Sequence, residues 1–222
     1  MSARIVKPAS TTWNFRNIVL ACALFLAGVW FGQWQVGHRR PAILLSPDGS
    51  VRVYFSPDGG ATRELVSLID AARHSVEVQA YSFTSRPLIR ALIAAERRGV
   101  AVCIILDRSH VERRNYRTRR FQRKISPALQ AFYSAGIPTY IDDRYLIAHN
   151  KIMLIDGGTV TTGSFNFSYA AAHYNAENML VIRGEPKLFA RYQANFNYHL
   201  HTSLQYKPGL VLTNQFHWPN RK

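Results

Sequence analysis

The segment at residues 100–107, VAVCIILD, which is apolar up to its last residue, is the feature that most constrains the fold. A strand with one exposed face alternates polar and apolar side chains, whereas a strand buried on both faces is apolar throughout. The preceding residues 86–99, RPLIRALIAAERRG, carry apolar side chains at helical spacing, with Pro near the start and Gly at the end. A buried strand that follows such a helix is typical of an α/β sheet with helices packed against it.

The alternation of strand and helix patterns continues along the chain. Strands are expected at residues 51–55, 75–83, 137–142, 149–155, 159–163 and 176–184, and helices at 61–73, 126–135 and 185–204. Because strands alternate with helices, parallel pairs are favoured. We therefore predict one α/β domain over residues 51–206, with a mixed, largely parallel β-sheet flanked by helices, and a C-terminal tail at residues 207–222.

The N-terminal part of the chain has a different composition. Residues 18–36, IVLACALFLAGVWFGQWQV, are 19 residues without a charge, long enough as a helix to span about 30 Å of hydrocarbon. A basic segment precedes them at residues 1–17, and a linker is expected at residues 37–50. The pattern predicts one hydrophobic helix, either a transmembrane anchor or a signal peptide, and the lack of a small-x-small cleavage pattern favours the anchor.

We expect a protein that is anchored in the cell membrane or exported to the periplasm, with its catalytic domain outside the cytoplasm. Basic residues flank both ends of the apolar segment, so the distribution of positive charge leaves its orientation open. Cys22 lies in this segment and Cys103 in an expected strand, so we expect no disulfide between them. No Cys/His spacing in the sequence is typical of a zinc site.

The excess of basic residues narrows the choice of partners. The chain has 28 Lys and Arg residues against 13 Asp and Glu residues, a formal charge of +15. Such a charge favours polyanionic partners, either nucleic acid or an anionic membrane face. A solvated basic surface is the alternative, and charge alone does not decide between them.

Much of this charge is concentrated in residues 108–124, RSHVERRNYRTRRFQRK, where eight of 17 residues are basic and one is acidic. One interpretation is a mobile, solvated loop. The other is a basic flap over an active site, with arginines on phosphates and the aromatic rings of Tyr116 and Phe121 on bases. The candidate substrate-binding residues are Arg113, Arg114, Arg117, Arg119 and Arg120.

Residues 149–168, HNKIMLIDGGTVTTGSFNFS, carry the pattern with the most chemical content. His149 and Lys151 share one face of an expected strand, about 7 Å apart, a spacing that fits a phosphate. After an Asp-Gly-Gly turn and a second strand, Ser164 and Asn166 are expected to offer donors at the start of a short helix, where amides attract anions. The joint pattern H-x-K-x(4)-D-x(6)-G-S-x-N is highly specific.

With this pattern the chain resembles the phospholipase D superfamily, and in particular its single-motif bacterial branch, which includes phospholipase D-like endonucleases. The residues that carry the match are His149, Lys151, Asp156, Gly163, Ser164 and Asn166. Downstream, NAENMLVI resembles the segment with the accessory glutamate of that branch, here Glu177. The resemblance covers about residues 51–200.

The resemblance implies hydrolysis of a phosphodiester in two steps through a phosphohistidine intermediate. One histidine, such as His149, attacks phosphorus, and a second histidine protonates the leaving oxygen and then activates water. Lys151 and Asn166, helped by Ser164, would hold the non-bridging oxygens and stabilise the developing charge. Glu177 would orient an imidazole.

The remaining carboxylate of the pattern, Asp156, is also a candidate site residue, although its place at the turn favours a structural role. The chemistry needs two histidines and the chain has one motif, so we expect a homodimer with His149 of each subunit facing the other across the two-fold axis. No cofactor is expected, and the sequence has no carboxylate cluster of the kind that two-metal nucleases use.

Three functions are compatible with the sequence. The first, favoured by the charge and the basic segment, is a non-specific endonuclease on DNA or RNA. The second, favoured by the apolar N-terminal segment, is a phospholipase D or cardiolipin hydrolase that acts on anionic phospholipid at a membrane. The third is an anchored protein that binds nucleic acid without turnover, and the intact motif argues against it.

Overall fold

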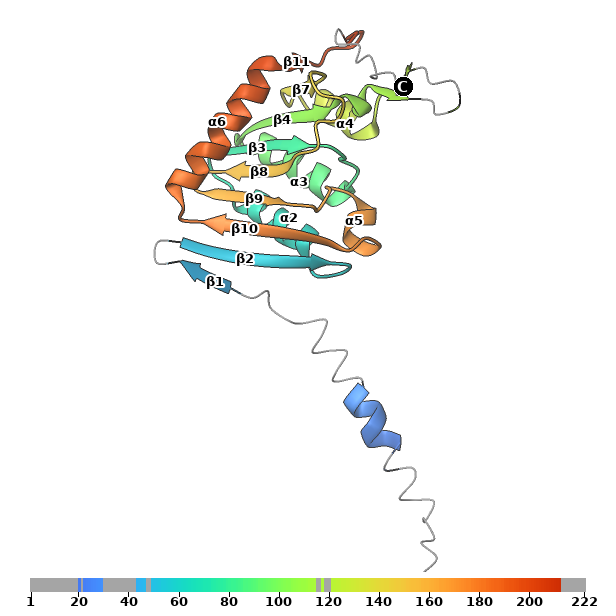
Figure 1. Cartoon of the computed structure of the whole chain (residues 1–222), viewed down its shortest axis with the longest axis vertical. Coiled ribbons are helices and arrows are strands. Elements are labelled where there is room, and N and C mark those ends of the chain that lie inside the picture. The colour runs from blue at the N-terminus through green and yellow to red at the C-terminus, as the bar shows by residue number, and fades with distance from the viewer. Residues whose placement is uncertain are drawn as a thin grey trace, which may run out of the picture. The chain divides into compact units, whose positions relative to one another are not determined.

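The computed structural model describes residues 20, 22–29, 43–46, 49–114, 117 and 121–212. The chain divides into two compact units, Met1–Arg40 and Pro41–Lys222. In the first unit, residues 20 and 22–29 are helical (Figure 1).

The predicted anchor or signal peptide at residues 18–36 lies mostly outside the described residues. Within the part of the chain that is described, no helix combines the length and the apolar character needed to cross a membrane. The basic segment at residues 1–17 and the end of the predicted tail, residues 213–222, also lie outside the described residues.

The second unit is an α/β structure. Its elements in chain order are β1 (Ile43–Ser46), β2 (Gly49–Ser56), α2 (Ala61–Ala71), β3 (Ser75–Ala80), α3 (Arg86–Arg97), β4 (Ala101–Asp107), η1 (Arg108–His110), β5 (Glu112–Arg114), β6 (Phe121–Arg123), α4 (Pro127–Ser134), β7 (Thr139–Asp142), β8 (Lys151–Ile155), β9 (Thr159–Gly163), α5 (Tyr169–His173), β10 (Glu177–Arg183), α6 (Pro186–Thr202) and β11 (Leu204–Gln205). Nine strands form one sheet in the order β1-β2-β10-β9-β8-β3-β4-β7-β11 (Figure 1). The strands and helices predicted between residues 51 and 204 are confirmed.

The sheet is mixed, as predicted, but the expectation that most of its pairs are parallel is wrong. β4 is parallel to β3 and to β7, and the other six neighbouring pairs of this sheet are antiparallel. The parallel strands are those joined through α3 and α4, because a helical crossover returns the chain to the edge where it began. β8 and β9 are joined by the tight turn at residues 156–158, which closes an antiparallel hairpin.

Part of the segment predicted to be a linker belongs to the sheet instead. β1 pairs antiparallel with β2, and Ser46 lies opposite Gly49, so the first SPDG sequence connects the two strands of a hairpin. The sequence Ile-Leu-Leu in β1 suits a strand, and pairing with β2 satisfies its backbone hydrogen-bonding groups.

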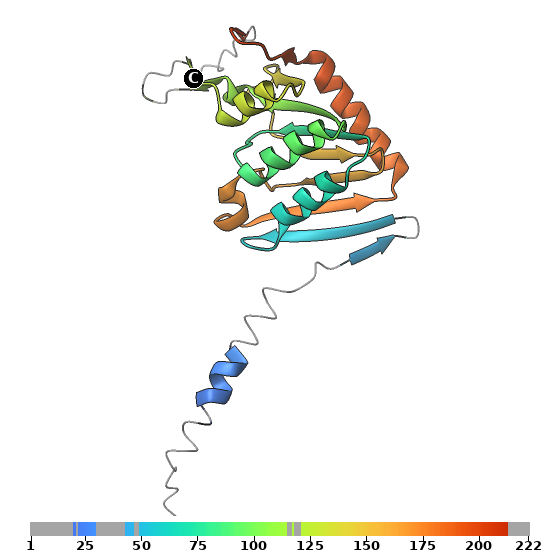
Figure 2. The ribbon, with the colours of Figure 1, turned by 180° about the vertical axis from the view of Figure 1, so that it is seen from behind.

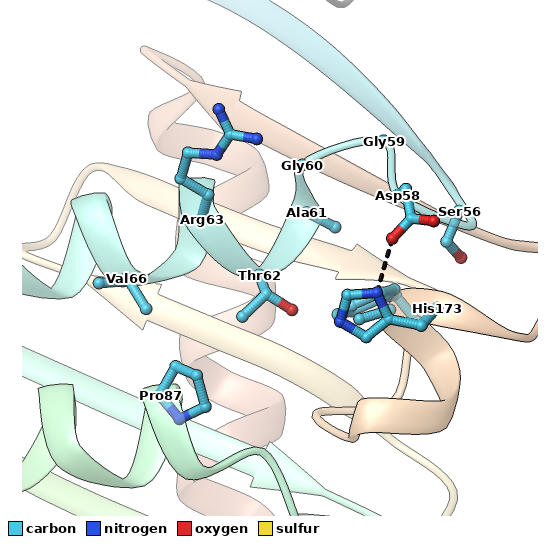
Figure 3. Close-up of a pocket in the computed structure, with 12 residues that line it drawn as sticks. Ser56, Asp58, Gly59, Gly60, Ala61, Thr62, Arg63, Val66, Pro87 and His173 are labelled. Carbon is cyan, nitrogen blue, oxygen red and sulfur yellow. Dashed lines mark hydrogen bonds and ion pairs between the residues drawn. The ribbon is translucent and has the colours of Figure 1, made fainter. Parts of the chain in front are cut away.

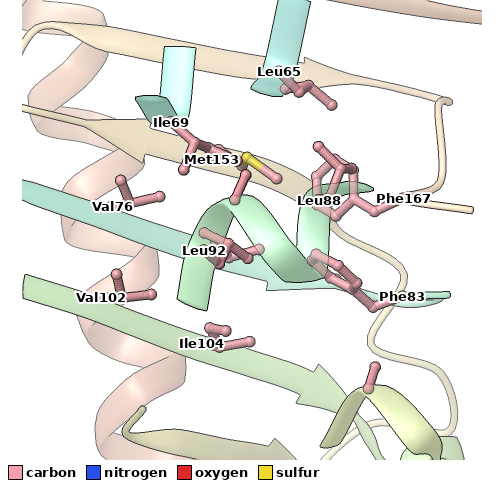
Figure 4. Packing of buried hydrophobic residues seen from close by; sticks show 14 of the residues in the cluster. Leu65, Ile69, Val76, Phe83, Leu88, Leu92, Val102, Ile104, Met153 and Phe167 are labelled. Carbon is pink, nitrogen blue, oxygen red and sulfur yellow. The ribbon is translucent and has the colours of Figure 1, made fainter. Parts of the chain in front are cut away.

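Helices cover both faces of the sheet: α2, α3 and α4 lie on one face and α6 on the other (Figures 1 and 2). The larger core, between the sheet and α2 and α3, includes the fully buried Leu65, Leu92 and Ile104 (Figure 4). The smaller core, under α6, includes Ile105 and Phe196. Successive residues of β4 enter opposite cores, which confirms that this strand is buried on both faces.

Candidate active site

The strand register brings the motif residues to one edge of the sheet. Lys151, the first residue of β8, lies opposite Ala80, the last residue of β3. Gly163, the last residue of β9, pairs with the start of β10, whose first residue is Glu177. The predicted site residues that lie at or next to this edge are His149, Lys151, Ser164, Asn166 and Glu177.

Lys151 is buried at this edge, with 6% of its surface exposed. Its Nζ donates a hydrogen bond to the carbonyl oxygen of His149 at 2.6 Å and lies 5.2 Å from the centroid of the Tyr81 ring. Burial lowers the pKa of Lys151, and electrostatic attraction to Glu177 and Asp107 opposes that shift. The ammonium group is therefore held close to two carboxylates and above an aromatic ring.

The imidazole of His149 is exposed, and its ring centroid lies 4.7 Å from that of Tyr81. Asp107, at the end of β4, fixes the backbone before His149, because its Oδ2 accepts a hydrogen bond from the Ala148 amide at 2.7 Å. Burial raises the pKa of the Asp107 carboxyl group, against hydrogen bonds from Ser109 and Ala148. Neither Tyr81 nor Asp107 was expected from the sequence. An acid at the end of a buried strand was the available signal for Asp107, and nothing in the sequence singled out Tyr81.

A glycine is required at the end of β9. The φ of Gly163 is 150°, and a Cβ there would lie 2.3 Å from the carbonyl oxygen of Asn178 in β10. That carbonyl accepts hydrogen bonds from the amides of Ser164 and Phe165 at 3.0 and 3.1 Å. The Ser164 Oγ accepts a hydrogen bond from the Asn178 amide at 3.0 Å, so its own proton is available to another acceptor.

Asn166 lies between two buried residues, Phe165 and Phe167. The Phe167 carbonyl oxygen accepts hydrogen bonds from the amides of Thr84 and Ser85 at 2.8 and 2.9 Å, which fixes this turn against the end of β3. Asn166 Oδ1 is buried and has no hydrogen-bond partner among the described residues. An unpaired buried carboxamide oxygen costs free energy, which is tolerated where a ligand or partner group completes a site.

The prediction that Ser164 and Asn166 stand at the start of a helix is wrong. α5 begins at Tyr169, and its N-cap is Ser168, whose Oγ accepts a hydrogen bond from the Ala171 amide at 3.1 Å. The residues before it are not helical, and the side chains of Phe165 and Phe167 are buried in the core. Helix amides therefore do not contribute to the site beside Ser164.

The carboxylate of Glu177 is held at the edge by neighbouring polar groups. Its Oε1 accepts a hydrogen bond from Asn175 Nδ2 at 3.1 Å. Its amide donates to Ser56 Oγ at 3.2 Å, and that hydroxyl donates to the Asn175 carbonyl oxygen at 3.0 Å. Glu177 is thus near Lys151, but its carboxylate is bonded to Asn175 and not to His149 of the same chain.

Asp156 lies at the opposite end of β8 from Lys151, about 17 Å away along the strand by the rise per residue. Its carboxylate accepts hydrogen bonds from the amides of Arg73, His74 and Ser75 at 2.8 to 2.9 Å. Burial raises the pKa of Asp156, but these hydrogen bonds and the charge of His74 outweigh burial and lower the pKa below its usual value. The structure therefore separates Asp156 from the other candidate site residues and gives it the role of joining the β8–β9 turn to β3.

The basic segment contains a β-hairpin and is not one continuous loop. β5 and β6 pair antiparallel, with Glu112 opposite Arg123. Of the candidate substrate-binding residues, Arg113 and Arg114 belong to β5, Arg117 is exposed, and Arg119 and Arg120 lie outside the described residues. We call β5, β6 and the residues between them the basic hairpin.

His110 anchors the basic hairpin to the site. Its Nδ1 lies 2.7 Å from Ser126 Oγ, and its Nε2 lies 3.2 Å from the carbonyl oxygen of Tyr81. Burial lowers the pKa of His110 to about 4, against the hydrogen bond with Tyr81, so the imidazole is neutral at pH 7. Because the Tyr81 ring contacts His149, one residue joins the base of the hairpin to the exposed imidazole.

Two hollows lie near the motif. The first, of about 480 Å³, is lined by His149 and by Arg191 of α6, among other residues. The second, of about 420 Å³, lies between the β2–α2 turn and α5, where His173 Nδ1 is 2.6 Å from Asp58 Oδ1 (Figure 3). Phe165 lines the second hollow, so this hollow lies behind the turn that carries Ser164.

Other histidines and carboxylates of the fold serve its packing. His199 of α6 lies 2.7 Å from the carboxylate of Asp142 in β7, and both residues are buried, which docks α6 on the sheet. In the described part of the chain, no three His, Cys, Asp or Glu side chains are grouped so that they could hold a metal ion.

Comparison with known proteins identifies the family of the chain. Residues 65–200 match the family described as "Cardiolipin synthase, PLD-like domain". The chain belongs to the phospholipase D superfamily. Among its superfamily relatives, "Phospholipase D" of Rickettsia conorii is 38% identical over 171 residues, which are 77% of this chain and 76% of the relative. "Mitochondrial cardiolipin hydrolase" of Xenopus laevis is 33% identical over 124 residues, 56% of this chain and 53% of that relative.

A solved structure supports the same assignment. The phospholipase D family member Nuc from Salmonella typhimurium has a TM-score of 0.62 with this chain at 35% sequence identity, over 72% of this chain and 99% of Nuc. As a member of the phospholipase D superfamily, the chain is a phosphodiester hydrolase with a mixed sheet flanked by helices.

Proposed function

We propose that this phosphodiesterase is a metal-independent, non-specific endonuclease on DNA and RNA that works as a homodimer. The observation that carries the proposal is the exposed imidazole of His149, which stands beside the buried ammonium group of Lys151 at a sheet edge joined to a basic hairpin. A cation next to a nucleophile suits an anionic phosphodiester, and a basic arm suits a polymer of them.

The reaction proceeds in two displacements. His149 attacks phosphorus, a P–N bond forms, and the P–O bond to the leaving group breaks while His149 of the partner subunit gives that oxygen a proton. The partner's His149 then takes a proton from water. The resulting hydroxide forms a new P–O bond, the P–N bond breaks, and His149 is released.

The surrounding groups stabilise charge on the phosphoryl oxygens. Lys151 supplies a fixed positive charge, and the hydroxyl of Ser164 is left free to donate because its oxygen already accepts from Asn178. The Nδ2 group of Asn166 would donate to a phosphoryl oxygen, because the Oδ1 of this carboxamide, which is buried and unpaired among the described residues, can only accept a hydrogen bond. These groups are held by strand ends and need little rearrangement on binding.

Two features favour a dimer. The mechanism uses two imidazoles, and His149 is the one motif histidine of the chain, exposed at the edge of the sheet. Glu177 is bonded to Asn175 within its own chain, so we place the imidazole that it orients on the partner subunit. A two-fold axis beside His149 would bring the two imidazoles together and would place Glu177 of each subunit beside the imidazole of the other.

The basic hairpin favours nucleic acid over lipid as the substrate. The formal charge of +15 and the basic hairpin provide phosphate contacts without a means of reading base sequence.

The second candidate, hydrolysis of cardiolipin or another phospholipid, is favoured by the names of the relatives from Rickettsia conorii and Xenopus laevis. The membrane anchor at residues 18–36 stays a prediction and would serve either substrate. The intact motif argues against a protein that binds without turnover.

The deciding experiment offers the full-length protein in detergent three substrates: plasmid DNA, RNA and cardiolipin vesicles, each with and without a chelator. We expect nucleic-acid cleavage that persists in the chelator and disappears in His149→Ala, while His201→Ala, a control at an exposed histidine of α6, stays active. Cleavage of cardiolipin without cleavage of nucleic acid would replace the first candidate with the second. Loss of all activity in the chelator would contradict the mechanism.

A further inference from the structure

The 480 Å³ hollow beside His149 has a chemical character of its own. Its lining includes His149 and Lys151, Thr162 and Gly163 at the end of β9, and Arg191 and Asn195 of α6. None of the described residues that line it is acidic. The hollow is therefore electropositive and continuous with the site of the proposed chemistry.

Arg191 is the cation of this hollow that the proposed mechanism does not use. It is exposed and forms no ion pair with the described residues, so its guanidinium group is not committed to a carboxylate of the fold. Asn195 lies one turn further along α6 and therefore on the same face of the helix. The two side chains present a planar cationic fork and a carboxamide to the same space.

We propose that this hollow binds the phosphate next to the scissile one in a polynucleotide, with Arg191 as its main ligand and Asn195 as an additional donor. The inference rests on the proposed nuclease function and specifies which part of the substrate α6 contacts. Arginine suits this role because its guanidinium group can donate two parallel hydrogen bonds to a phosphate. A substrate with a single phosphodiester has no group for this place, so Arg191 selects for a polymer.

The test compares trinucleotides that contain two linkages. In one both linkages are phosphodiesters, and in two others the linkage on the 5′ or the 3′ side of the cleavable bond is a neutral methylphosphonate. We measure kcat/KM for cleavage of the phosphodiester bond that remains in each methylphosphonate trinucleotide and of the same bond in the all-phosphate trinucleotide. The proteins compared are the wild type, Arg191→Gln and Lys187→Gln. Lys187→Gln is the matched control because it removes one exposed positive charge from the same helix outside the hollow. Bis(4-nitrophenyl) phosphate, which has one phosphodiester and no neighbour, reports on the chemical step alone.

We expect a methylphosphonate on one side to lower kcat/KM of the wild type about tenfold, because the neutral linkage cannot form a charge-assisted hydrogen bond with Arg191. Arg191→Gln should show the same decrease on the all-phosphate trinucleotide, no further decrease on the methylphosphonate, and wild-type activity on bis(4-nitrophenyl) phosphate. Lys187→Gln should respond to the methylphosphonate as the wild type does.

Three results would overturn the inference. Arg191→Gln and the neutral linkage could lower kcat/KM independently, so that their effects multiply. Arg191→Gln and Lys187→Gln could lower kcat/KM equally, or Arg191→Gln could leave kcat/KM unchanged. If the wild type cleaves bis(4-nitrophenyl) phosphate and cardiolipin but no trinucleotide or DNA, the proposed nuclease function is itself wrong and the inference falls with it. Failure of the inference alone is recognised by a wild type that cleaves trinucleotides.

Discussion

The ring of Tyr81 lies 4.7 Å from the ring of His149 at an interplanar angle of 56°, and the same ring lies 5.2 Å from the Nζ of Lys151. One aromatic side chain at the end of β3 thus contacts both basic groups of the motif. Its ring restricts the orientation of the exposed imidazole and offers the buried ammonium group a favourable π-face.

Replacing Tyr81 should therefore impair catalysis more than folding. We expect Tyr81→Ala to lower kcat on bis(4-nitrophenyl) phosphate by about tenfold or more, because the aromatic ring that positions His149 is removed. Tyr81→Phe keeps the ring and should retain most of the activity. Thermal unfolding of each variant shows whether the protein is intact. Equal kcat values for the alanine and phenylalanine variants would mean that the ring does not position the imidazole.

Subunit mixing tests whether each reaction needs His149 from both subunits. His149→Ala subunits are mixed with wild-type subunits at constant total protein. If the site needs both imidazoles, the activity should be proportional to the square of the wild-type fraction. A linear decline would show that one wild-type subunit is competent. The control exchanges the wild type with His201→Ala, and activity should then stay constant.

The carboxylate of Asp156 should stabilise the fold without taking part in chemistry. We expect Asp156→Asn, which tolerates the left-handed backbone at this position, to lower the free energy of unfolding by about 1–3 kcal/mol and leave kcat unchanged. The pKa of Asp156 is lower in the folded chain, so its contribution is present above the unfolded pKa of about 3.9 and is lost as pH falls through the folded pKa. Urea unfolding of the wild type and of Asp156→Asn between pH 7 and pH 3 measures whether their free energies of unfolding become equal as the pH falls. A loss of kcat at unchanged stability would restore Asp156 to the catalytic set.

The buried imidazole of His110 should make the fold sensitive to mild acid. Its pKa is about 4 in the folded chain and about 6.5 when unfolded, so the unfolded chain binds more protons between these values and stability falls as pH falls. Between pH 7 and pH 5 we expect a loss of about 2 kcal/mol in the free energy of unfolding. His110→Gln should remove this part of the pH dependence. An identical slope in that variant would show that His110 is protonated without cost.

The basic hairpin should contribute to binding by neutralising phosphates. We expect replacement of Arg113, Arg114 and Arg117 by Gln to weaken DNA binding and to reduce the slope of log K against log salt by about 0.9 for each phosphate that is no longer neutralised. A matched control replaces three exposed arginines of α3, Arg86, Arg90 and Arg97. Filter binding at several salt concentrations measures the slopes. If the two triple variants have the same slope, the hairpin is not a specific binding surface for DNA.

The local pattern of the sequence predicted those parts of the site that lie on one stretch of chain. His149 and Lys151 follow from strand alternation, and Gly163 from the need for a sharp exit from β9, where a Cβ would meet the backbone of β10. The direction of the strands was harder to predict, because the pattern of apolar residues in β8 and β9 would be the same in a parallel and in an antiparallel pair. The turn at residues 156–158 decides it.

Residues that reach the site from other strands could not be predicted in this way. Tyr81 depends on the register of β3 against β8, Asp107 on that of β4 against β3, and Arg191 on how α6 lies across the sheet. Such relationships arise from tertiary packing, which one sequence does not encode as a local period. The separation of Asp156 from its motif partners is local instead, because five residues of extended strand carry it to the far edge.

The exposed imidazole of His149, just before the first residue of β8, has a consequence for regulation. In the proposed homodimer each chain would contribute half of the catalytic centre, so two copies would need to meet but not to refold. A hydrolase built in this way would be idle when scarce and would switch on as its own abundance rises, which protects the cell's phosphodiesters from stray single copies.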